Sequence, residues 1–186
     1  FVASVVFVAD KYQQEFFKHL QDICVTIKAD GAQGSGFMKT RIVKNGDKDE
    51  LTTFIWTAGH VVDSLRKTRI IVDSKTGTNK TVIEFKDAEV VQELTQNGRR
   101  VGEIKMDAQV VRFSNHNTGE DLALLRVRKT NFVNPTVSVQ FYLDEAIPPI
   151  GSELFHVGSL HGQVGANSLT TGIISQHGRV LNGVTY

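Results

Sequence analysis

The sequence predicts an all-β protein that carries one short α-helix near its N-terminus. Short β-rich runs recur along residues 23–186 and turn signals separate them, a spacing typical of a sandwich or barrel. Before residue 23, apolar residues instead recur at helical spacing. At 186 residues, the chain is long enough for one large core or for two small barrels that share an interface.

Residues 1–22 are predicted to form an N-terminal arm and an amphipathic helix. The apolar residues 1–9 are about half as long as a membrane span requires. They fit the tail of a removed signal, a cut transmembrane segment or an arm that docks on a neighbour. Asp10 and Gln13 form a capping-box pattern at the start of the helix. The helical spacing is carried by Tyr12, Phe16, Phe17, Leu20 and Ile23.

Residues 23–130 are predicted to form a first β-barrel. Turn-forming residues such as Asn and Gly separate its strand-like runs. The predicted strands are 23–28, 36–44, 51–57, 69–73, 80–85, 89–94, 108–114 and 122–127. The long interval between His60 and Asp121 further predicts an elaborated hairpin within residues 69–107.

Residues 131–186 are predicted to begin a second β-barrel. A connector at 131–135 precedes strand-like runs at 153–158, 168–176 and 179–186. These strands are too few to close a barrel, so we expect an incomplete sheet whose edge is exposed or covered by a partner. That partner would be a C-terminal continuation of the chain or a second chain.

Composition argues against several classes of ligand. The formal net charge of +1 gives no overall field that would favour nucleic acid or an anionic membrane. No glycine-rich phosphate loop is present, and the histidines lack the spacing of zinc ligands. We therefore expect no cofactor, no metal and no nucleic-acid partner.

Cys24 is the single cysteine of the chain, so an intrachain disulfide is impossible. Its surroundings, residues 23–27, are β-rich and apolar, which predicts a small buried side chain rather than a reactive thiol. A fold without disulfides suits a bacterial, viral or otherwise reducing setting.

Two motifs place candidate catalytic residues at the ends of strand-like runs. His60 ends the segment Thr-Ala-Gly-His after one apolar run, and Asp121 opens another. A hydroxyl nucleophile needs a base within hydrogen-bond reach and a carboxylate that orients this base. Imidazole suits the base because its ordinary pKa is about 6.5. Taken singly, the motifs also fit a surface histidine and a turn aspartate.

In combination, these motifs resemble the trypsin-like (chymotrypsin-fold) serine proteases, particularly the disulfide-poor bacterial and viral branch that includes the high-temperature-requirement proteases. Four elements follow the order of that family: 34–37, 56–62, 121–125, and 151–158 followed by 170–175. The resemblance covers about residues 23–186. It implies a double β-barrel and peptide hydrolysis in which His60 is the base and Asp121 its orienter. Val61 stands where animal relatives carry a disulfide cysteine.

The nucleophile motif of that family, Gly-x-Ser-Gly-Gly, does not occur in residues 1–186. The resemblance puts it beyond Tyr186, so we expect a serine-type endopeptidase that acts on polypeptide substrates and is inactive as this chain alone. Ser35, although flanked by glycines, fits a structural role where backbones approach closely. Ser159, Ser168 and Ser175 also lack the motif. The alternative is a catalytically inactive protease-like module for binding or assembly.

Overall fold

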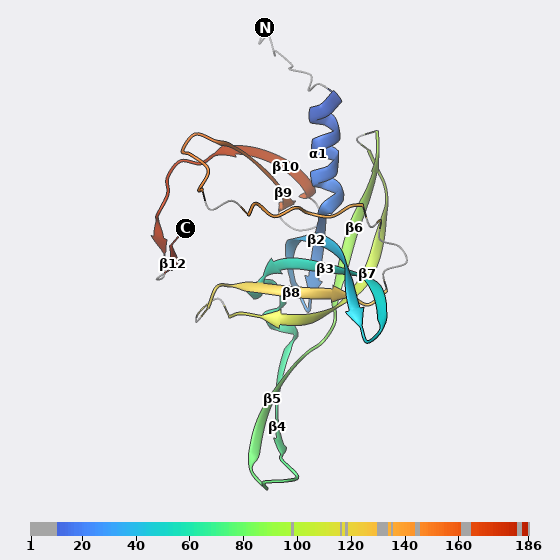
Figure 1. Cartoon of the computed structure of the whole chain (residues 1–186), viewed down its shortest axis with the longest axis vertical. Coiled ribbons are helices and arrows are strands. Elements are labelled where there is room, and N and C mark those ends of the chain that lie inside the picture. Colours follow the sequence, from blue (N-terminus) through green and yellow to red (C-terminus); the bar gives the residue numbers. More distant parts are fainter. Residues whose placement is uncertain are drawn as a thin grey trace.

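One closed barrel of six antiparallel strands dominates the computed structural model (Figure 1). The structure describes residues 11–97, 99–115, 117, 119–129, 134, 136–143, 146–160, 165–181 and 184–185. Around the barrel the strands are ordered β1-β2-β3-β8-β7-β6. Their bounds are β1 Cys24–Ala29, β2 Ala32–Asn45, β3 Lys48–Ala58, β6 Ala88–Gln96, β7 Arg99–Phe113 and β8 Leu122–Val127. A mostly β fold with a short N-terminal helix is therefore confirmed.

The barrel is held together by a core to which every strand contributes. Each of the six strands supplies one apolar side chain with 0% exposure. Burying a large apolar side chain contributes roughly 1.5–3 kcal/mol. These residues are Ile27, Met38, Ile55, Val90, Ala108 and Leu125. Alternation along the strands explains this arrangement, because every second side chain points inward.

A short helical segment after β3 packs into the same core. It consists of α2 (Gly59–Val62) and a 3₁₀ turn (Asp63–Leu65), and Val61 is buried in it. A Cβ atom at Gly34 of β2 would lie 2.4 Å from Val61 Cγ2, and one at Gly36 would lie 2.8 Å from the Trp56 carbonyl oxygen. The interpretation of the glycines around Ser35 as positions of close approach is confirmed.

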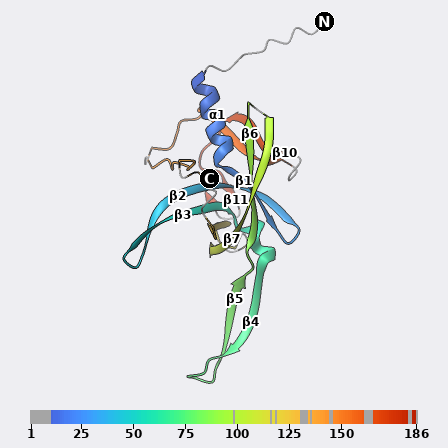
Figure 2. The ribbon, with the colours of Figure 1, turned by 90° about the vertical axis from the view of Figure 1, so that its right-hand side faces the viewer.

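The predicted elaborated hairpin is present, but it leaves the barrel. β4 (Arg66–Val72) and β5 (Asn79–Phe85) pair only with each other and project away as a separate ribbon (Figures 1 and 2). Most side chains on both faces of the ribbon are solvent-exposed, including Ile70 and Ile83. Six of the eight strands expected in the first barrel therefore build it.

The C-terminal segment forms small sheets. β9 (Glu153–Leu160) pairs with β10 (Gly165–Ile173), and β11 (Val180–Leu181) pairs with β12 (Val184–Thr185). The single strand predicted over 179–186 is wrong, because the chain there divides into two short strands. Within the described residues these sheets do not close into a second barrel, as expected from the strand count. Of the predicted connector 131–135, only Asn134 lies among the described residues.

The helix α1 (Lys11–Ile23) links the barrel to the β9–β10 hairpin (Figure 2). The rings of Phe16 and Phe17 lie 5.6 and 5.1 Å from the ring of Phe155, centroid to centroid. Gln21 donates a hydrogen bond of 3.1 Å to the Asn167 carbonyl. The predicted arm 1–9 and the cap residue at position 10 lie outside the described residues. No helix in the described part has the length and apolar character needed to cross a bilayer.

Cys24 is buried on β1, and burial, assisted by the charge of Glu93, raises its thiol pKa to about 11. Because the thiolate is the reactive form, the folded chain is expected to resist iodoacetamide at pH 8, whereas the urea-unfolded chain reacts. Mass spectrometry of the alkylated protein measures both rates. Equal rates in the folded and unfolded chains would contradict this expectation.

The guanidinium of Arg128 donates two hydrogen bonds, of 2.8 and 2.9 Å, to the carboxylate of Asp87, and this lowers the Asp87 pKa. A carboxyl group whose pKa is lower in the folded chain than in the unfolded chain stabilises the fold at pH values above its unfolded-state pKa. This stabilisation is lost as the pH falls through the folded-state pKa. Since both side chains are partly exposed, Asp87→Asn is expected to lower the free energy of unfolding by less than about 1 kcal/mol at neutral pH. Urea titrations should show this difference shrink in acid, and a pH-independent difference would contradict the assignment.

Candidate active site

The register of two barrel strands brings the two candidate catalytic residues together. His60 lies in α2, directly after β3, and Asp121 lies directly before β8. β3 and β8 pair antiparallel, with Ala58 opposite Leu122. The end of β3 and the start of β8 therefore meet at one end of the barrel, and they bring together His60 and Asp121, which are 61 residues apart in sequence.

Three hydrogen bonds fix the pair. Asp121 Oδ2 lies 2.8 Å from His60 Nδ1, and Asp121 Oδ1 accepts the backbone N–H of His60 at 2.8 Å. The N–H of Gly59 donates to the Asp121 carbonyl at 2.9 Å. The two side chains therefore lie within hydrogen-bond distance, which the role of orienter expected for Asp121 requires. With Nδ1 directed to the carboxylate, Nε2 is the ring nitrogen suited to exchange a proton with a nucleophile.

The backbone around the pair leaves little room for change. Asp121 has a φ of +54°, in the left-handed region that aspartate adopts more readily than most residues. A Cβ atom at Gly59 would lie 2.3 Å from the Ser114 carbonyl oxygen. A glycine is therefore required beside His60. A non-glycine residue in the left-handed region, such as Asp121, is strained, and residues of this kind are concentrated at functional sites.

Ser114, which the sequence did not indicate as part of the site, closes the loop before Asp121. Its backbone N–H donates to the Leu122 carbonyl at 2.8 Å, and its Oγ accepts the N–H of Glu120 at 2.9 Å. A Cβ atom at Gly119 would lie 2.2 Å from this Oγ. Ser114 thus holds both ends of the loop that delivers Asp121. The sequence signal that could have indicated this role is the position of Ser114 directly before a turn rich in asparagine.

Two of the serines considered as alternative nucleophiles have hydroxyl groups engaged in hydrogen bonds between the barrel and β9. Ser35 Oγ accepts the backbone N–H of Ser159 at 2.7 Å, and Ser159 Oγ lies 2.6 Å from Thr26 Oγ1. These bonds tie the barrel to β9, which agrees with the structural role predicted for Ser35. Ser168 lies within β10 and Ser175 follows it.

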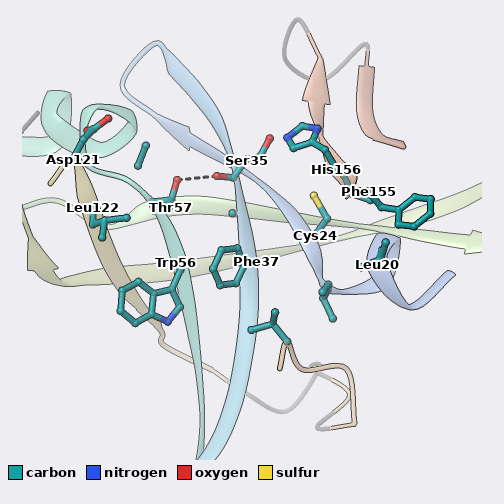
Figure 3. Close-up of a pocket in the computed structure, with 15 residues that line it drawn as sticks. Leu20, Cys24, Ser35, Phe37, Trp56, Thr57, Asp121, Leu122, Phe155 and His156 are labelled. Atoms are coloured by element: carbon teal, nitrogen blue, oxygen red, sulfur yellow. Dashed lines mark hydrogen bonds between the residues drawn. The ribbon is translucent and has the colours of Figure 1, made fainter. Parts of the chain in front are cut away.

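A cavity of about 470 Å³ adjoins Asp121, between the barrel, the end of α1 and β9 (Figure 3). Asp121 lies at one end of it, and Leu20 and Phe155 lie at the other. Four of its 15 lining residues are polar or charged: Ser35, Thr57, Asp121 and His156. The cavity therefore joins an apolar interior to the carboxylate that holds the histidine.

Among the described residues, no three His, Cys, Asp or Glu side chains come together in a way that would hold a metal ion. No protein-family model and no curated protein sequence matches the chain. The chemistry of the site is therefore inferred from its geometry.

Proposed function

We propose that this chain supplies the base and the orienting carboxylate of a trypsin-like serine endopeptidase. The observation that carries the proposal is the 2.8 Å contact between His60 Nδ1 and Asp121 Oδ2, with the second carboxylate oxygen on the His60 backbone N–H. One carboxylate therefore holds both the ring and the backbone of His60, although the His60 side chain is 61% exposed. Such fixation serves a group whose orientation matters for proton transfer.

In the proposed reaction, His60 Nε2 takes the proton of a serine hydroxyl as the serine oxygen attacks the carbonyl carbon of the scissile peptide. Asp121 stabilises the imidazolium that results. The imidazolium then gives its proton to the leaving nitrogen, the C–N bond breaks and an acyl-enzyme remains. A water molecule, deprotonated by the same ring, hydrolyses the ester and restores the serine.

The serine and the donors that stabilise the oxyanion belong, in this proposal, to polypeptide beyond Tyr186 or to a second chain. The separate β9–β10 sheet supports this view, since a two-stranded sheet has two edges on which further strands can pair. Its attachment to the barrel through Ser35 and Ser159 would hold a second barrel beside the His60–Asp121 pair.

Hydrolysis of a dye-labelled unfolded protein tests the proposal. The 186-residue chain is expected to show no activity above buffer, and a C-terminally extended chain is expected to be active. His60→Ala in the extended chain should lower the rate about 10⁴-fold or more, because the base and nucleophile act as a unit. His19→Ala, on α1, is the matched control and should retain activity.

An extended chain that folds but hydrolyses nothing would contradict the proposal and favour the inactive binding or assembly module. Equal activity of the His60→Ala and His19→Ala variants would contradict the role of His60.

A further inference from the structure

A basic groove lies on the outer face of the barrel, apart from the cavity beside Asp121. Its volume is about 490 Å³, and it crosses β2, β3, β8 and β7, which are neighbours in the barrel (Figure 1). Its side chains alternate with core residues such as Ile55 and Leu125, which places it on the outer face. Among the described residues it shares no lining residue with that cavity, and four basic residues line it: Arg41, Lys44, Arg112 and Arg126.

The positive charge of the basic groove is only partly neutralised within the protein. Among the described residues that line it, Glu50 is the one acidic side chain. None of the four basic residues forms an ion pair with any other described part of the chain. Arg126 and Arg112 donate hydrogen bonds of 3.2 and 3.1 Å, but only to uncharged oxygen atoms. Because like charges repel one another, the field in the groove favours an anionic occupant.

The arginines are spread across the basic groove rather than gathered at one point. Arg41 lies on β2, Arg126 on β8 and Arg112 on β7. Three steps between neighbouring strands, of about 4.8 Å each, separate β2 from β7, so Arg41 and Arg112 start roughly 14 Å apart. A polymer with one negative charge per unit can contact the arginines in turn. A single small anion could reach both outer arginines only if they bent toward it.

Phe54 adds a stacking surface to the basic groove. It lies on β3 opposite Arg126, and the guanidinium carbon of Arg41 lies over its ring, 5.1 Å from the centroid. Nucleobases stack on aromatic rings and on guanidinium planes, and this contact is open to every base. A partner that uses both features of the groove therefore carries repeated phosphates and unpaired bases.

An acidic polypeptide fits the basic groove less well. The groove lies on a sheet face whose backbone groups already pair within the barrel, so a peptide cannot add to it as a further strand. Its carboxylates would contact the arginines, but it would leave the stacking surface at Phe54 unused.

We propose that the basic groove binds single-stranded nucleic acid, with its arginines on successive phosphates and a base against Arg41 and Phe54. Arginine suits this role because a guanidinium donates two parallel hydrogen bonds to one phosphate. The expectation of no nucleic-acid partner rested on the net charge of +1, which averages over the whole chain and conceals a local field. The groove is separate from His60 and Asp121, so this proposal goes beyond the proposed peptide hydrolysis and does not depend on it.

Fluorescence anisotropy of a short fluorescein-labelled oligothymidylate, titrated with the 186-residue chain, tests the proposal. Saturable binding is expected at about 50 mM salt. If about three phosphates are contacted, the Kd should rise about 20-fold between about 50 and 200 mM salt, because bound counterions are released on binding. The absence of saturable binding at the lower salt concentration, or a Kd that does not depend on salt, would overturn the proposal.

The double variant Arg112→Gln/Arg126→Gln removes two phosphate contacts. It should raise the Kd at about 50 mM salt more than tenfold and reduce the salt effect to about threefold. The double variant Lys67→Gln/Lys80→Gln is the matched control, because it removes the same net charge from the exposed ribbon of β4 and β5. Circular dichroism checks that both variants fold. Equal Kd values for the two folded variants would show that overall charge, and not the groove, binds the strand.

Competition against the labelled strand identifies the class of partner. Unlabelled oligothymidylate should displace it at a charge concentration about tenfold or more below that of polyglutamate, which has no bases to stack. Equal competition would overturn the assignment to nucleic acid and favour an acidic polypeptide. Phe54→Leu keeps an apolar side chain without the ring and should raise the Kd about fivefold or more. An unchanged Kd in this folded variant would contradict the stacking contact.

Discussion

Asp121→Asn is expected to lower kcat of a C-terminally extended chain about 10⁴-fold. An asparagine side chain can still accept the His60 backbone N–H through its carbonyl oxygen, so the loop geometry is retained. Its amide nitrogen, however, would face Nδ1 as a donor and hold the ring in the wrong tautomer. Steady-state hydrolysis of a peptide substrate measures the effect.

Asp47→Asn, in the exposed turn between β2 and β3, is the control for the same chemical change and should leave kcat unchanged. A loss of less than tenfold in the Asp121→Asn variant would show that the carboxylate does not orient a catalytic base.

Gly59→Ala is expected to have the second largest effect, on both structure and activity. Its Cβ would lie 2.3 Å from the Ser114 carbonyl oxygen, a backbone atom that cannot rotate away. Relief of this overlap must move α2 or the loop before Asp121, at a cost of about 1–3 kcal/mol in the free energy of unfolding. A displacement of about 1 Å at His60 would lower hydrolysis roughly 10²-fold.

Gly102→Ala provides the matched control in β7. There the nearest atom to the new Cβ is Leu94 Cδ1, at 3.9 Å, so the free energy of unfolding should change by less than about 0.5 kcal/mol. Urea unfolding and hydrolysis are measured for both variants. Indistinguishable results for Gly59→Ala and Gly102→Ala would show that close packing at position 59 does not hold the site.

The predicted strands agree with the observed ones where apolar alternation is strong. β8 was expected at 122–127 and forms there, and β3 was expected at 51–57 and contains this run. β7 begins at Arg99 rather than at the predicted residue 108. Its first half carries charged side chains on an exposed surface, and backbone pairing with β6 extends the strand where apolar periodicity gives no signal.

The contact between His60 and Asp121 was predictable because His60 follows one strand-like run and Asp121 opens another, in motifs of the family that the chain resembles. Ser114 and the cavity were not predictable in the same way. The hydrogen bond from the Glu120 N–H to Ser114 Oγ depends on the conformation of the loop between them, which no sequence pattern indicates. The cavity combines residues that are far apart in sequence, such as Leu20, Trp56 and Phe155. Periodicity indicates which side chains are buried, whereas strand pairing decides which of them meet.

The central claim is that His60 and Asp121 activate a serine nucleophile. It is tested most directly with a fluorophosphonate, which reacts with activated serines, followed by mass spectrometry to map the modified residue. We expect no labelling of the 186-residue chain. An extended chain is expected to be labelled at a serine beyond Tyr186, and His60→Ala should abolish this labelling. Labelling mapped to Ser35 or Ser159, or labelling that persists in the His60→Ala variant, would contradict it.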